Sequence, residues 1–136
     1  MSIPFIDKSN YLKGLLIIAR KDKKLADSEK KIISGIAESL GFAKDFYEEV
    51  LHNLLANKYI DEQPLKFSDK KIAESFVLDG LRLIYSDEYV EANEIDWLRK
   101  VAEENSIDEK WFNERLTSFK NNVKAAKTDF ALLSII

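Results

Sequence analysis

A stretch of 31 residues occurs twice in this chain, and this internal repeat constrains the fold more than any other feature. Residues Ser86–Leu116 align without a gap on residues Lys21–Leu51, which lie 65 positions earlier. The identical pairs are Asp22/Asp87, Glu29/Glu94, Ala37/Ala102, Glu38/Glu103, Glu49/Glu114 and Leu51/Leu116. Most apolar positions of the first copy are apolar in the second, as Ile33 is matched by Leu98, although Leu40 is matched by Asn105 and Val50 by Arg115. Self-similarity at a constant offset indicates a duplicated structural unit.

Each copy has the hydrophobic pattern of helices. Apolar residues recur at spacings of three and four throughout, and no alternating run bounded by turn residues predicts a strand. A unit of three helices cannot enclose its own core, because each helix has an apolar stripe that needs a facing partner. We therefore expect an all-α, compact helical bundle of two pseudo-symmetric three-helix repeats, with the first and fourth helices in the middle.

The length of 136 residues and an apolar content of 46% predict one domain over residues 1–136. We assign repeat one to about residues 11–58, the connection to about 59–67 and repeat two to about 68–124. Pro64 keeps the connection from being helical. The last segment, 125–136, is an apolar C-terminal tail that we expect to pack on this domain or on a neighbouring subunit.

Turn and cap residues predict where several helices begin and end. Residues 1–7 form a short lead-in, and Ser9 or Asn10 is the predicted cap of the first helix. Ser68 is the predicted cap of the fourth helix, Asp108 caps the sixth, and Gly41 ends the second in a left-handed position.

Composition narrows the function. A net charge of −3 and a pI near 5.3 argue against nucleic-acid binding, which needs clustered positive charge. The chain has no cysteine, so disulfides and thiolate metal sites are excluded. The apolar runs are too short to predict a transmembrane segment or a signal peptide, and a cytoplasmic location is the default expectation. We expect no enzyme, because no nucleophile with a neighbouring base and no glycine-rich phosphate loop is present.

The repeat leaves a duplicated acidic loop, in which a glutamate follows an aspartate after six residues. The pairs are Asp22 with Glu29 and Asp87 with Glu94. A helical wheel places both glutamates on the core side of their helices. One interpretation is local: a glutamate at the third helical position accepts from a free N–H group of the first turn. The other is an oxygen-only cation site.

A cation site built from these loops limits the choice of metal. Carboxylate oxygens favour calcium, magnesium or manganese, while one histidine and no cysteine disfavour zinc and copper. The spacing is not that of an EF-hand, which needs a glutamate eleven residues after its first aspartate. The second loop is the more acidic, so Asp87, Glu91 and Glu94 are the favoured ligands, followed by Asp22 and Glu29.

The doubled loop also carries a family resemblance. An aspartate that ends one helix, a glutamate seven positions later and a following Ala-Glu, as at Ala102-Glu103, resemble the TerB-like family of bacterial tellurite-resistance proteins and related co-chaperone domains. The resemblance covers roughly residues 11–119. It implies a non-catalytic helical module that binds a divalent cation weakly in a metal-stress or tellurite-stress response, or that scaffolds protein complexes. The alternative is a metal-free interaction domain that meets a protein partner, or its own copies, through the acidic loop or the C-terminal tail.

Other conspicuous residues have structural interpretations. Asp79 has Arg82 three residues later and Ser75 four residues earlier, which predicts an ion pair at the edge of the apolar stripe. His52 stands alone in its helix, and Trp97 and Trp111 occupy positions that predict core packing.

Overall fold

The computed structural model describes residues 2–21, 25–56, 61–87, 89–121 and 129–136. These residues form α-helices and one short 3-10 helix, with no strand among them. The elements are α1 (Phe5–Lys21), α2 (Asp27–Ser39), α3 (Lys44–Ala56), α4 (Lys70–Ile84), α5 (Ala92–Glu104), α6 (Glu109–Asn121) and the 3-10 helix η2 (Ala131–Ser134). The prediction of a compact all-α fold is confirmed.

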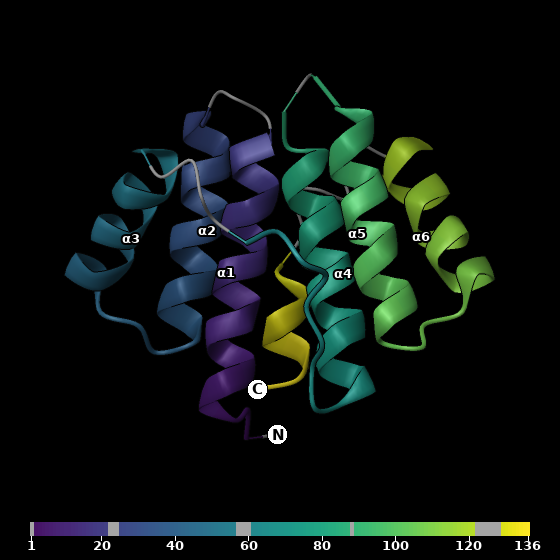
Figure 1. The fold of residues 1–136 in the computed structure, drawn as a ribbon, viewed down its shortest axis with the longest axis horizontal. Coiled ribbons are helices and arrows are strands. Elements are labelled where there is room, and N and C mark those ends of the chain that lie inside the picture. The colour runs from purple at the N-terminus through teal and green to yellow at the C-terminus, as the bar shows by residue number, and fades with distance from the viewer. Residues whose placement is uncertain (1, 22–24, 57–60, 88, 122–128) are drawn as a thin grey trace.

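The helices form two groups around a central pair (Figure 1). Helices α1, α2 and α3 lie on one side, and α4, α5 and α6 lie on the other. Helix α1 packs against α4 in the middle, while α2 and α5 flank this pair and α3 and α6 lie outermost. Residues far apart in sequence therefore make the centre of the molecule.

The two central helices are apolar around most of their circumference, which is why they are covered on several sides. Leu15, Ile17 and Ile18 of α1 are 0% exposed, as are Phe76 and Leu81 of α4. The outer helices bury one stripe each, and α6 buries only Phe112 and Phe119 among its residues.

Helix α1 begins at Phe5, earlier than the predicted cap at Ser9 or Asn10, so the expected lead-in is wrong. Pro4 precedes the helix and accepts the first turn's bond from the Lys8 N–H, at 3.0 Å. Asp7 is 1% exposed within this first turn. A proline suits a helix start because its ring presets the backbone and no N–H is lost there.

Helix α4 is capped by Asp69, whose Oδ1 accepts the Lys71 N–H at 2.7 Å, so the prediction of Ser68 is wrong. Ser68 is engaged elsewhere, because its N–H and its hydroxyl both donate to the buried carboxylate of Asp7. The predicted caps at Asp108 and Gly41 are confirmed, by a 2.9 Å bond from the Lys110 N–H and by a φ of +91° respectively.

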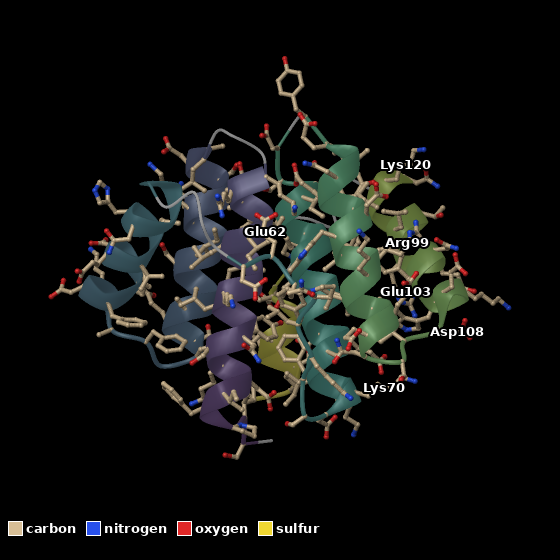
Figure 2. The ribbon with its side chains drawn as sticks, in the orientation of Figure 1. Glu62, Lys70, Arg99, Glu103, Asp108 and Lys120 are labelled. Carbon is tan, nitrogen blue, oxygen red and sulfur yellow. The ribbon has the colours of Figure 1, made fainter. Side chains whose placement is uncertain are left out.

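The described part of the connection, residues 61–67, crosses in front of the central pair in Figure 1. The Asn105 side chain holds it, since Nδ2 donates to the Leu65 carbonyl at 2.7 Å and Oδ1 accepts the Phe67 N–H at 2.8 Å. Glu62, labelled in Figure 2, accepts from Lys21 Nζ at 2.8 Å. The connection is therefore part of the packed structure.

No helix in the ranges given above combines the length and the apolar character that a membrane crossing requires.

Candidate functional site

The first acidic loop is described only at its helical end, because Asp22 lies outside the described residues. Glu29 is the third residue of α2 and is 2% exposed. Its Oε1 accepts the backbone N–H of Ala26 at 3.2 Å. This is one half of a capping box, and Ala26 has no side-chain oxygen that could complete the other half. This hydrogen bond supports the interpretation of Glu29 as a capping residue of its own helix.

The second acidic loop places its carboxylates in three different environments. Asp87 is half-buried beyond the end of α4, Glu91 is the exposed N-cap residue of α5, and Glu94 is 2% exposed at the third helical position. The prediction that Glu29 and Glu94 face the core is confirmed by their burial. Their companions Asp87 and Glu91 are more accessible.

The ends of α1 and α4 that lead into the two loops, and the starts of α2 and α5 that follow them, lie at the same end of the molecule (Figure 1). The Ser28 hydroxyl at the start of α2 donates to the Ser86 carbonyl beyond α4, at 3.5 Å. Within the described residues, however, no three or more histidine, cysteine, aspartate or glutamate side chains are grouped as metal ligands. The fold brings the two loop regions together without assembling the described carboxylates into one cluster.

An apolar groove between α1 and α3 is a feature that the sequence interpretation missed. It encloses about 230 Å³ and is lined by Ser9, Leu12, Lys13, Leu16, Phe42, Phe46 and Val50. Leu12 and Leu16 form its floor on α1 and are 4% and 2% exposed. Lys13 is the only charged residue among the described residues of the lining. This groove is hereafter the α1/α3 groove.

Large apolar side chains are exposed beside the α1/α3 groove. Phe46 is 51% exposed and stacks on Phe42 with ring centroids 5.5 Å apart, and Phe42 meets the Phe5 ring edge-on at 6.4 Å. Phe5 is 74% exposed, and its neighbour Ile6 is 68% exposed but lines a separate hollow beside Lys66 and Phe67 of the connection. A connected aromatic surface of this kind is uncommon on a protein face that meets only water. The Phe5-Ile6 pair, in a segment predicted as a lead-in, was the available sequence signal.

A related cavity lies between α4 and α6. It also encloses about 230 Å³ and is lined by Lys71, Glu74, Ser75, Leu78, Trp111, Ala131, Ser134 and Ile135. Three lining positions match those of the α1/α3 groove at the 65-residue offset, namely Ser9/Glu74, Lys13/Leu78 and Phe46/Trp111. The difference is that η2 and Ile135, from the C-terminal segment, form one wall of the second cavity.

Asp79 is the centre of a buried polar cluster and is 0% exposed. Tyr11 Oη donates to its Oδ2 at 2.5 Å, and Arg82 Nη1 donates to its Oδ1 at 2.5 Å. The backbone N–H groups of Ala131 and Leu132 add two bonds, at 2.7 and 3.1 Å. The predicted ion pair with Arg82 is confirmed, but the predicted place at the edge of the stripe is wrong.

Burial controls the ionisation of this cluster. It raises the pKa of the Asp79 carboxyl above its usual value, and the bonds from Tyr11 and Ala131 and the charge of Arg82 oppose that shift. Burial also raises the pKa of Tyr11 well above its usual value, with the negative charge of Asp79 acting in the same direction. Tyr11 therefore remains a hydrogen-bond donor to Asp79.

The C-terminal segment packs on its own chain. This is one of the two predicted alternatives, the other being packing on a neighbouring subunit. Leu132 is 0% exposed, and η2 contacts both α4 and α2. The Phe130 ring lies over Gly35, where an added Cβ would come within 2.7 Å of a ring carbon. Leu133 and Ile136 remain 46% and 50% exposed. The segment is thus seated by one face, and its other face meets solvent.

Comparisons with family models, with curated proteins and with solved structures give no match for this chain. The TerB-like resemblance therefore remains a prediction that rests on the repeated residues around Asp22 and Asp87.

Proposed function

We propose that this chain is a non-catalytic TerB-like interaction module whose α1/α3 groove binds the apolar face of a helical segment from a partner protein. The supporting observation is the combination of a concave apolar lining with the exposed side chains of Phe5 and Phe46. Concave grooves lined by apolar side chains are typical seats for amphipathic helices, which insert residues spaced by three and four.

The energetics favour a segment that inserts a few large side chains. Each leucine-sized or phenylalanine-sized side chain transferred from water contributes about 1.5–3 kcal/mol. A groove of about 230 Å³ accommodates such side chains, whereas a flat partner surface would leave it empty. Phe46 would be covered at the same time, which adds the burial of a ring that is 51% exposed.

The charge of the lining specifies one further property of the partner. Lys13 carries the one charge among the lining residues that the structure describes, so the segment is expected to carry an aspartate or glutamate beside its apolar stripe. The chain itself provides the template for an apolar occupant, because the related cavity between α4 and α6 has the C-terminal segment as one wall. In this structure that segment packs on its own chain through the buried Leu132, and the proposed occupant of the α1/α3 groove is a segment of a different protein.

Selection from a library of displayed helical peptides on the full chain tests the proposal. We expect enriched peptides to share an apolar stripe and an acidic residue, and to shift the methyl NMR signals of Leu12, Leu16 and Val50. Phe46→Lys should abolish binding, and Tyr89→Ser is the matched control because Tyr89 is 73% exposed but outside the lining. Lys13→Glu should change the preference from acidic to basic peptides.

Two results would reject the proposed groove function. One is that selected peptides bind the Phe46→Lys and Tyr89→Ser chains equally well. The other is that the protein binds vesicles containing anionic lipid through Phe5 and Ile6 while no peptide is enriched, which would assign this surface to a membrane.

A second candidate function is weak binding of a divalent cation at the acidic loops, in the stress response that the TerB-like resemblance implies. It is supported by the 3.5 Å bond between Ser28 and Ser86, which joins the start of α2, after the first acidic loop, to the segment that begins the second. Asp87 and Glu91 are the accessible described ligands of such a site.

We also infer that the two helix groups are copies of one unit, including residues 65–67 and 130–132, which follow the first and the second group. At the 65-residue offset, the buried Leu65 and Phe67 of the connection match Phe130 and Leu132 of the C-terminal segment. A superposition of the two halves tests this: residues 12–51 should align on residues 77–116 with the same helix order and crossing directions.

A further inference from the structure

We propose that the C-terminal segment occupies a peptide-binding seat in cis, and that an apolar segment of a partner protein can displace it. The seat is formed by Asp79 and Leu78 of α4, Gly35 of α2 and Trp111 of α6. Its ligand chemistry is a short helical turn with two free backbone N–H groups at its start and an apolar residue at its second position. This seat is separate from the α1/α3 groove.

Recognition at the seat combines the negative charge of Asp79 with the space left over Gly35. The first N–H groups of a helical turn have no partner within the turn, and a carboxylate at that end is favourable. Asp79 meets this need by accepting from Ala131 and Leu132. Gly35 provides the shape, since only a residue without a Cβ leaves room for the Phe130 ring at 2.7 Å.

Release of the segment does not leave the charge of Asp79 without a partner. Two of its four bonds come from the segment, and the other two come from Tyr11 and Arg82, which belong to α1 and α4. A buried carboxylate that lost all its donors would make release very costly. The cluster instead remains paired in the empty seat, so the bound and the released states are both compatible with the fold.

The segment also fills its seat incompletely. A cavity of about 230 Å³ remains beside Ala131, Ser134 and Ile135, and Leu133 and Ile136 stay half exposed. A partner segment with a larger side chain at the position of Ser134 would occupy this cavity. Such a ligand would bury apolar area that the chain's own segment leaves unburied, and this gives it an advantage in competition.

Competition within the full chain tests the proposal. The sequence contains no cysteine, so Ile136→Cys provides a single position for an environment-sensitive fluorophore, next to Ile135, which lines the same cavity as Trp111. Added peptide with the sequence of residues 129–136 should displace the labelled segment reversibly. Millimolar peptide is needed, because a tethered segment has an effective concentration of about that size.

Three peptide variants make the test specific. Replacing the serine that corresponds to Ser134 by leucine should improve displacement about tenfold. Replacing the leucine that corresponds to Leu132 by aspartate should abolish displacement, and a scrambled peptide serves as the control. Displacing peptides should shift the amide NMR signals of Gly35 and Asp79.

Hydrogen exchange of the unlabelled chain provides the second measurement. If the seat opens, the N–H groups of Ala131 and Leu132 exchange faster than those of Leu15 and Ile18 in the core. The proposal is overturned if the two sets exchange at the same rate through global unfolding, and also if no peptide displaces the segment at millimolar concentration.

Discussion

The Asp79 carboxylate of α4 accepts the backbone N–H of Ala131 at 2.7 Å, so a buried charge in the fourth helix anchors the C-terminal segment. The two residues lie 52 positions apart in the sequence. Through this contact the segment, the central helices and the polar cluster form one connected unit, and their contributions to stability can be separated by substitution.

Asp79→Leu should lower the free energy of unfolding by about 3–5 kcal/mol, because it leaves the Arg82 guanidinium buried without its carboxylate. The double variant Asp79→Leu/Arg82→Met removes both charges and should recover a large part of that loss. Urea unfolding of the single and double variants measures both values. Equal destabilisation of the two would mean that the ion pair is not the source of the effect.

The free energy of unfolding should depend on pH through the ionisation of Asp79. Burial raises its pKa in the folded protein above the ordinary value of 3.8, so the folded state binds this proton more tightly than the unfolded chain does. The contribution of Asp79 to the free energy of unfolding is therefore greatest below 3.8 and decreases as the pH rises through the raised folded pKa. Unfolding curves of the wild type and of Asp79→Asn across this range measure the difference.

A titration of the Asp79 carboxyl carbon by NMR checks the assignment directly. Since the Arg82 charge lowers the pKa, Arg82→Gln should move the midpoint to a still higher pH. A lower midpoint in this variant would contradict the described role of Arg82.

Gly35→Ala should destabilise the protein although alanine is the better helix former by about 1 kcal/mol. The reason is the Phe130 ring, which a Cβ at this position would meet at 2.7 Å. In a Phe130→Ala background the same substitution should become neutral or stabilising. Thermal unfolding of the four chains forms a double-mutant cycle. Additive effects would show that Gly35 and Phe130 do not interact.

Calcium, magnesium or manganese at millimolar concentration should raise the melting midpoint if the acidic loops bind a cation, by mass action. Asp87→Asn/Glu91→Gln should remove this gain, and both side chains are accessible enough to be changed without opening the core. An unchanged midpoint of the wild-type chain with all three ions would leave the local capping interpretation of Glu29 as the better one.

Local patterns predicted what local forces determine. Helical spacing predicted the helices, the helical wheel predicted that Glu29 faces the core, and Gly41 was correctly placed as a helix end with φ of +91°. In each case the deciding residues lie within a few turns of one another.

The errors came from contacts between distant residues. Serine and aspartate are both good N-cap residues by type. Asp69 caps α4 in the structure because Ser68 donates its hydrogen bonds to Asp7, which lies 61 positions away. Asp79 was predicted at the edge of the apolar stripe because local sequence shows only Arg82 and Ser75 as partners. Its donor Tyr11, which helps to satisfy the carboxylate in the core, lies 68 positions away. The α1/α3 groove escaped prediction because no single helix contains it.

The packing of α1 against α4 affects how the chain is made on the ribosome. Leu15 and Ile18 of α1 are fully covered in the finished protein, yet the helix that covers them is translated only after α2, α3 and the connection. Until α4 emerges, the first three helices present an uncovered apolar face to the cell, at the stage when nascent chains are most prone to aggregate. Slower translation of residues 61–84 should therefore increase the binding of holding chaperones to the nascent chain.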